Sequence, residues 1–215
     1  SSWVHEGRGL IGLGRALVIE AHGAERIEAL RAAWRAVVGA AWWRDALVRP
    51  GTGPVALGAI TFSPSSEQSS VLVVPEVLVG LDDSGAWLTT VVSGPDDGTE
   101  PEHPDPGSLL KALVADARAA VDREQAGTDR DSGDCGDTTA VEAGALSEQQ
   151  WCRAICATQE RMRAGQARKV VLARDVLAYP GGPLATGTVL RRLASDYPST
   201  WVFAVDQMVG ASPEL

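Results

Sequence analysis

Residues 70–92 read SVLVVPEVLVGLDDSGAWLTTVV, and this stretch sets the strand pattern of the chain. Two runs rich in β-branched and aromatic residues, Ser70–Val79 and Ala86–Val92, predict strands, and the loop LDDSG at residues 81–85 is rich in turn formers. A third strand-like run, Val55–Phe62, precedes them. Consecutive strands joined by polar loops indicate an antiparallel meander and not repeated βαβ units.

The remaining segments add helices and further strands around this meander. Residues 9–23 predict one or two strands with a glycine-rich turn, and residues 24–41 predict a helix with one apolar face. A helix is predicted from Leu109 to about Glu124, capped by Ser108, and a second helix starts with a capping-box pattern at Ser147 and stops near Gly165. The elements predicted after it are a strand at Lys169–Ala173, a helix at Thr188–Ser195 and a strand at Trp201–Val209.

Composition narrows the class of protein. The chain has 215 residues, 45% of them hydrophobic, and seven tryptophans, which excludes disorder throughout. No apolar stretch is long enough to cross a bilayer, and no basic-then-apolar leader opens the sequence, so we expect a soluble cytoplasmic protein without a membrane partner. The sequence has no basic stripe with interleaved aromatics, so we expect no nucleic acid partner either.

The net charge of −9 is unevenly distributed. Residues 93–108 carry five acids and no base, and residues 122–142 carry seven acids and two arginines. These stretches together hold more negative charge than the whole chain, so the rest is near neutral and can bind an anionic ligand. Because the stretches are also rich in Pro, Gly and polar residues, we expect an acidic, flexible insertion at about residues 93–146.

Two patterns could indicate a zinc site and a dinucleotide-binding site, but the surrounding sequence supports neither. Cys152 and Cys156 would share one helical face, but a zinc site needs four ligands and no histidine lies nearby, so buried or half-buried thiols are expected. Residues 7–12, GRGLIG, fit the dinucleotide-binding glycine pattern, yet no strand precedes them and no βαβ unit surrounds them. Glycines in a tight turn or bulge explain this pattern better.

Lys169 and Glu214 are the candidate acid–base residues. The chain has seventeen arginines but only two lysines, Lys111 and Lys169, and only a desolvated lysine can lose its proton and act as a base. On spacing alone, a strand-edge lysine whose amine reaches water explains Lys169 better. Glu214 follows Ser212-Pro213 after an apolar strand, and it could either face a cleft or stabilise a helix N-terminus.

Two segments nevertheless resemble signatures of the chorismate-utilising enzymes, the isochorismate synthases in particular. They are KVVLAR at residues 169–174 and GASPEL at residues 210–215, in the order and about the distance expected. The resemblance implies an α+β, anthranilate synthase component I-like (chorismate-binding) fold of mainly antiparallel sheets packed with helices, incomplete here. Residues 1–215 would then form the N-terminal part of a single chorismate-binding domain.

The resemblance also implies a reaction and roles for both residues. In isochorismate synthases water attacks C2 of chorismate, the double bonds shift, and the C4 hydroxyl leaves from the opposite face. The family's general base maps onto Lys169 and its general acid onto Glu214. Relatives that use ammonia usually carry glutamine at the lysine position, so Lys169 favours water addition, which gives isochorismate, or salicylate if pyruvate is also eliminated.

Other expectations concern parts that this sequence lacks. The resemblance implies a Mg²⁺ cofactor with its ligands beyond residue 215, so we expect no metal ligand in this chain and no activity from it without the C-terminal half of the same enzyme. Menaquinone synthesis is the expected pathway, with siderophore synthesis left open. The alternatives are a salicylate synthase, an anthranilate or aminodeoxychorismate synthase component, and a non-catalytic chorismate-fold binding module.

Overall fold

The computed structural model of the chain describes residues 1–92, 94, 105–128, 140–179 and 185–213. The chain divides into two compact units, residues 1–126 with 185–215 and residues 127–184. We describe each unit by itself. Among the described residues, no helix is both long and apolar enough to cross a lipid bilayer.

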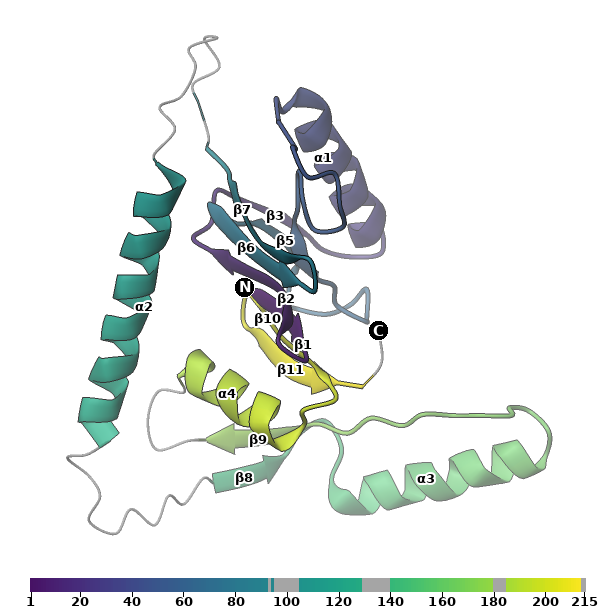
Figure 1. Cartoon of the computed structure of the whole chain (residues 1–215). Coiled ribbons are helices and arrows are strands. Elements are labelled where there is room, and N and C mark those ends of the chain that lie inside the picture. The colour runs from purple at the N-terminus through teal and green to yellow at the C-terminus, as the bar shows by residue number, and fades with distance from the viewer. Residues whose placement is uncertain (93, 95–104, 129–139, 180–184, 214–215) are drawn as a thin grey trace. The chain divides into compact units, whose positions relative to one another are not determined.

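The larger sheet of the first unit has six antiparallel strands (Figure 1). Its strands, in spatial order, are β11 (Met208–Ser212), β10 (Trp201–Val205), β1 (Ser2–His5), β2 (Arg8–Leu13), β6 (Val77–Asp82) and β7 (Gly85–Thr90). Strand β1 therefore pairs with β2, its neighbour in sequence, and with β10 near the other end of the chain, where Trp3 faces Phe203. The first and last parts of the described chain meet in the middle of this sheet.

A second sheet of three antiparallel strands packs on the first. It consists of β3 (Leu17–Ala21), β5 (Ser70–Val74) and β4 (Leu57–Ala59). Both sheets share one bent ribbon, because β2 pairs with β6 in the first sheet and β3 pairs with β5 in the second. The bend lies between two residue pairs: Leu13 pairs with Val77 in the first sheet, and Leu17 pairs with Val74 in the second.

The bend corrects one sequence prediction. The run Ser70–Val79 is not one strand but two, β5 and β6, which belong to different sheets. Pro75 lies at the break, where it is buried, and a proline has no N–H to continue a strand ladder. The second correction concerns Trp201–Val209, which forms the hairpin β10–β11 because Asp206 turns the chain with a φ of 53°.

The core of the first unit lies between the two sheets. Leu57, Val71 and Val73 of the three-stranded sheet contact Val205 of the six-stranded sheet, with Trp3 packed against them. Helix α1 (Arg26–Ala40) packs on β3 and β5, and helix α4 (Thr186–Asp196) packs on β10 and β11. Both helices were predicted, and the described structure confirms an arrangement of antiparallel sheets packed with helices.

Strand β1 precedes residues 7–12, contrary to the sequence prediction, and the glycines of the β1–β2 hairpin bear out the turn interpretation of these residues. Gly7 has a φ of 76° in the turn between the two strands, and Gly9 has a φ of 135°. A Cβ on Gly9 would lie 2.0 Å from the carbonyl oxygen of Trp3. The glycine pattern therefore permits a tight hairpin.

The loop between α1 and β4 is anchored on the six-stranded sheet through Trp87. The indole N–H of Trp87 donates to the carbonyl of Gly51 at 3.0 Å, and the Arg49 guanidinium lies 5.6 Å from the centre of the ring. Inside the loop, Asp45 accepts hydrogen bonds from the Thr52 hydroxyl and from the amides of Leu47 and Val48. These bonds lower the pKa of Asp45, with the Thr52 bond contributing most.

Helix α2 (Pro106–Thr128) covers the helix predicted from Leu109, but its cap differs from the prediction. Asp105, and not Ser108, accepts the hydrogen bonds at its N-terminus, because the Ser108 amide and hydroxyl both donate to Asp105 Oδ2 at 2.8 Å. Residues 93, 95–104 and 129–139 lie outside the described residues, so the flexible insertion at about 93–146 stays a prediction.

The described residues 140–179 of the second unit form one helix and one pair of strands. Helix α3 (Glu148–Arg163) begins with the predicted capping box, in which Ser147 accepts from the Gln150 amide and the Gln150 side chain accepts from the Ser147 amide. Strands β8 (Ala140–Ala143) and β9 (Val176–Tyr179) form a separate antiparallel pair. None of the described residues 140–179 is buried.

Candidate active-site segments

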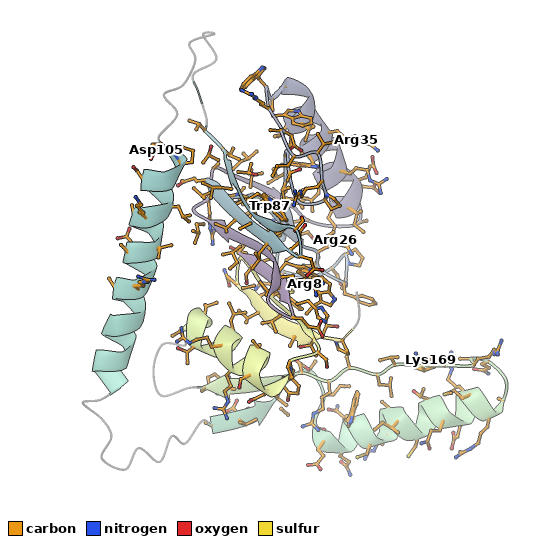
Figure 2. All side chains as sticks on the ribbon, in the orientation of Figure 1. Arg8, Arg26, Arg35, Trp87, Asp105 and Lys169 are labelled. Atoms are coloured by element: carbon orange, nitrogen blue, oxygen red, sulfur yellow. The ribbon has the colours of Figure 1, made fainter. Side chains whose placement is uncertain are left out.

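Lys169 lies in an extended segment between α3 and β9 (Figure 2). Helix α3 ends at Arg163 and is followed by Gly165, which has a φ of 76°. The Gln166 amide donates back to the carbonyl of Arg161 at 3.0 Å. The chain then runs through Lys169 without regular structure to Val176. Lys169 is exposed, and within the described part of the chain its amine has no ion-pair partner.

The strand predicted at Lys169–Ala173 is not formed, and this prediction is wrong for the chain described here. Residues 168–174, which we call the unpaired segment, make no backbone hydrogen bond to any part of the chain that the structure describes. A run of apolar, β-branched residues becomes a strand only where another backbone pairs with it. We find no such partner among the described residues.

Asp175 fixes the C-terminal end of the unpaired segment. Both oxygens of its carboxylate accept from the Ala145 amide, at 3.0 and 3.2 Å, and its carbonyl accepts from the Gly144 amide at 3.4 Å. A Cβ on Gly144 would lie 2.1 Å from Asp175 Oδ2, so a larger residue at this position would displace the carboxylate. Sequence analysis missed this clasp, since the partners lie 30 residues apart and neither belongs to a recognisable motif.

The segment that carries Glu214 follows the edge strand of the six-stranded sheet. Residue Ser212 is the last of β11 and pairs with Trp201, and Pro213 is exposed. Glu214 itself lies outside the described residues. Its role as the general acid therefore stays a prediction.

Aromatic side chains gather on the sheet next to the end of β11. The Trp3 ring stacks on Phe203 at 5.0 Å between ring centres, and His5 stacks on Trp201 at 4.8 Å. Gly210 of β11 lies beside Phe203, where a Cβ would approach the ring to 2.7 Å. The glycine of the GASPEL segment therefore leaves room for a large ring on the neighbouring strand.

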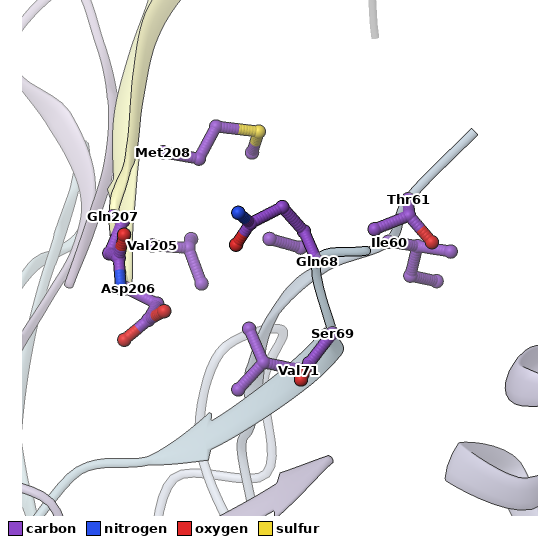
Figure 3. Close-up of a pocket in the computed structure, with 10 residues that line it drawn as sticks. Ile60, Thr61, Gln68, Ser69, Val71, Val205, Asp206, Gln207 and Met208 are labelled. Atoms are coloured by element: carbon purple, nitrogen blue, oxygen red, sulfur yellow. The ribbon is translucent and has the colours of Figure 1, made fainter. Parts of the chain in front are cut away.

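A pocket of about 310 Å³ lies at the other end of the β10–β11 hairpin (Figure 3). Its apolar floor includes Val71 and Val205, and its polar rim includes Gln68, Ser69 and Asp206. The Asp206 carboxylate pairs with Arg15 at 3.1 Å. The pocket is built from the first unit alone and contains neither Lys169 nor the residues next to Glu214.

Metal-binding residues are the remaining component that the chemistry could require. Among the described residues, no three His, Cys, Asp or Glu side chains gather as they would around a metal ion. Cys152 and Cys156 are exposed on α3 and not buried or half-buried as expected. We therefore assign no ligand for Mg²⁺ to the described residues.

Comparisons with known proteins extend over nearly the whole chain. Residues 3–215 match the family described as "Chorismate binding enzyme". The isochorismate synthase MenF of Bacillus subtilis (strain 168) is 27% identical over 224 aligned positions, which cover 95% of this chain and 44% of that protein. The chain thus spans less than half the length of this relative. No solved structure matches it.

The family match includes both segments on which the sequence analysis relied. KVVLAR at residues 169–174 and GASPEL at residues 210–215 lie inside the matched range of residues 3–215. The match extends to the N-terminal strands β1 and β2, which pair with each other and lead into both sheets. This chain belongs to the family of chorismate binding enzymes.

Proposed function

We propose that the protein to which this chain belongs is an isochorismate synthase, which converts chorismate to isochorismate and serves menaquinone synthesis. The observation that carries the proposal is the similarity to the Bacillus isochorismate synthase over 95% of this chain, together with a lysine at the start of the KVVLAR segment. We further propose that the fold of the whole enzyme is anthranilate synthase component I-like.

In the proposed reaction Lys169 is the general base. Its neutral amine takes a proton from water as the water oxygen bonds to C2 of the substrate ring. The ring double bonds shift, and the bond from C4 to its hydroxyl breaks. Glu214 is the general acid, which gives its proton to the leaving hydroxyl so that water departs. Base and acid then stand on opposite faces of the ring.

This chemistry requires both groups in their less usual protonation states. Burial disfavours the charged form of either group, so a water-poor cleft would favour a neutral lysine and a neutral glutamic acid. Lys169 is exposed in the 215-residue chain. We therefore expect that this chain alone does not turn over chorismate and that the rest of the enzyme must cover Lys169.

The experiment replaces Lys169 with Gln in the full-length enzyme that contains this chain. Chorismate turnover in the presence of Mg²⁺ is followed by chromatography, which separates isochorismate, salicylate and aminated products. Loss of a general base predicts that kcat falls by about 10²–10⁴-fold. Lys111→Gln is the matched control, because Lys111 is the only other lysine in these 215 residues and lies exposed on α2.

Three results would contradict the proposal. Unchanged turnover by the Lys169→Gln enzyme would remove the base from the mechanism. Salicylate or an aminated product from the unaltered enzyme would assign the chain to another branch of the family. An enzyme with no chorismate-dependent activity, but with measurable chorismate binding, would indicate a non-catalytic module.

A further inference from the structure

Two thiols of helix α3 have no part in the proposed reaction. Cys152 and Cys156 are both free and exposed. They lie four residues apart within α3, so they are neighbours on the helix surface, with about 5–6 Å between their Cβ atoms. Free cysteine is among the most often buried residue types in proteins, so packing does not explain a pair of exposed thiols.

Helix α3 holds this pair on a regular backbone. The capping box at Ser147 satisfies the first turn, and the Gln166 amide donates to the carbonyl of Arg161 at the other end. Both cysteines lie between these two ends. Side chains four residues apart share one face of a helix, so the spacing of the two thiols is set by the helix itself.

The thiols lie away from the apolar side of the helix. The half-buried side chains of α3 include Trp151, Ile155 and Met162, which form one stripe. With 3.6 residues per turn, Cys152 and Cys156 are turned about 80° and about 120° from the middle of this stripe. A segment that packs on the stripe therefore does not need to cover the thiols.

The spacing suits a bound ion better than a disulfide. The Cβ atoms of a disulfide are about 3.5–4.5 Å apart, which is less than the separation across one helix turn, so a disulfide would distort α3. With metal–sulfur bonds of about 2.3 Å, as in zinc thiolates, two sulfur atoms on opposite sides of one ion are about 4.6 Å apart. Two cysteines one turn apart can reach this separation without any change of the backbone.

The number of ligands indicates which ion fits. Within the part of the chain that the structure describes, no third His, Cys, Asp or Glu side chain completes a metal-binding group with the two thiols. A structural zinc site uses four ligands, so the pair alone does not suit zinc. Thiolates also select Cu(I), a soft ion that is stable between two sulfur ligands in a line.

Binding exchanges two protons for one cation. Both S–H bonds break, the protons go to water, and each sulfur supplies the electron pair of one S–Cu bond, so copper stays Cu(I). The complex carries one negative charge. Arg153, a neighbour of Cys156 on the helix surface, attracts this charge, whereas Glu148 and Glu160, one turn beyond either end of the pair, repel it. The sulfur atoms, and not the surrounding charges, therefore select the ion.

We propose that Cys152 and Cys156 form a two-coordinate site for Cu(I) on the surface of α3. The site is independent of the proposed function, since neither Lys169 nor chorismate takes part in it. Copper binding without chorismate turnover, or turnover without copper binding, would separate the two.

The test uses the reduced full-length enzyme that contains this chain, in the absence of oxygen. Cu(I) is titrated in competition with a chromophoric chelator, and the loss of the chelator's colour measures the copper that the protein takes. The unaltered enzyme should bind one Cu(I) per chain more than Cys152→Ser or Cys156→Ser. In either variant the affinity of the site should fall by at least about 100-fold, since changes around the ligands alone lower metal affinity 10–100-fold.

Two controls separate the position of the thiols from their number. Cys135→Ser removes the third cysteine of these 215 residues and should bind copper like the unaltered enzyme. Cys156→Ser combined with Ala157→Cys keeps two thiols on α3 but turns the second about 140° around the helix from Cys152. Circular dichroism should show an unchanged helix, and the Cu(I) affinity should fall as in Cys156→Ser.

Four results would overturn the proposal. They are equal copper uptake by the unaltered enzyme and Cys152→Ser, unweakened binding by the relocated pair, and thiols that react with a thiol reagent only after the enzyme is unfolded. The fourth is one ion per two chains, with a doubled mass in light scattering on copper addition, which would place the site between two copies and not within one helix.

Discussion

Ser70–Val74 and Lys169–Ala173 are two five-residue segments of similar apolar character, SVLVV and KVVLA, with opposite outcomes. The first forms β5, pairs on both edges with β3 and β4, and buries four of its five residues. The second pairs with nothing in the described part of the chain and stays exposed. This difference shows that an apolar sequence permits a strand but does not determine one. The strand forms where a neighbouring backbone pairs with it and its side chains become buried.

The largest expected difference between the two segments is in hydrogen exchange. Amides of β5 should open only with the whole unit, so a domain stability of at least about 5 kcal/mol slows their exchange by about 10³-fold or more. Amides of residues 168–174 should exchange at close to the rate of an unfolded chain. Mass spectrometry of exchange over time measures both in one sample, and equal rates would contradict the comparison.

Two tryptophans extend the contrast to side chains. Trp87 is 9% exposed, covers Gly80 and donates to Gly51, so Trp87→Ala should lower the free energy of unfolding of the first unit by about 3–5 kcal/mol. Trp151 on α3 is only half-buried, and Trp151→Ala should leave that free energy nearly unchanged. Urea denaturation followed by circular dichroism tests both, with the exposed Trp42→Ala as control.

The capping box of α3 allows a smaller and more local test. Ser147→Ala removes the side-chain acceptor of the Gln150 amide, which lowers helix stability by about 1 kcal/mol. Since α3 has no buried residue, the loss should appear as lower helicity of α3 and not as a lower melting temperature of the first unit. Ser147→Asp keeps an acceptor and should retain the helix. A shift of the first unit's melting temperature in Ser147→Ala would contradict the expectation that the effect stays within α3.

The smallest expected effect is the pH response of the Asp45 loop. The hydrogen bond from Thr52 contributes most to a lowered pKa of Asp45 in the folded chain, so the ionised form stabilises the loop above the ordinary aspartate pKa. This contribution is lost as the pH falls through the lowered pKa. Thr52→Val should move the carboxyl titration of Asp45, followed by NMR, toward higher pH, and an unchanged titration would show that the Thr52 bond is not formed.

Sequence reasoning succeeded where local pattern and local structure coincide. The helix from residue 24, the capping box at Ser147 and the antiparallel strands around residues 81–85 are all determined by neighbours in sequence. It failed where a single residue redirects the chain, as Pro75 does between β5 and β6 and Asp206 does between β10 and β11. Both breaks lie within apolar runs, where periodicity alone predicts continuity.

For the candidate site, the sequence identified the segments but not their surroundings. Lys169 was placed in a strand because its neighbours are apolar, and the structure shows that those neighbours lack a paired backbone. The clasp between Asp175 and Ala145 could not be foreseen, since it depends on how β8 and β9 align. The chemical roles of Lys169 and Glu214 remain proposals based on the family.

The pairing of β1 with β10 has a consequence for how the protein is made. Residues 1–92 can form β1, β2, β6 and β7 early during synthesis. Strand β10 begins only at Trp201, so one edge of β1 stays unpaired while more than a hundred further residues are translated. At ordinary ribosomal rates this takes roughly 5–20 s. During that time the nascent chain exposes an unprotected sheet edge that carries Trp3, which is where a chaperone, or a neighbouring nascent chain, would bind first.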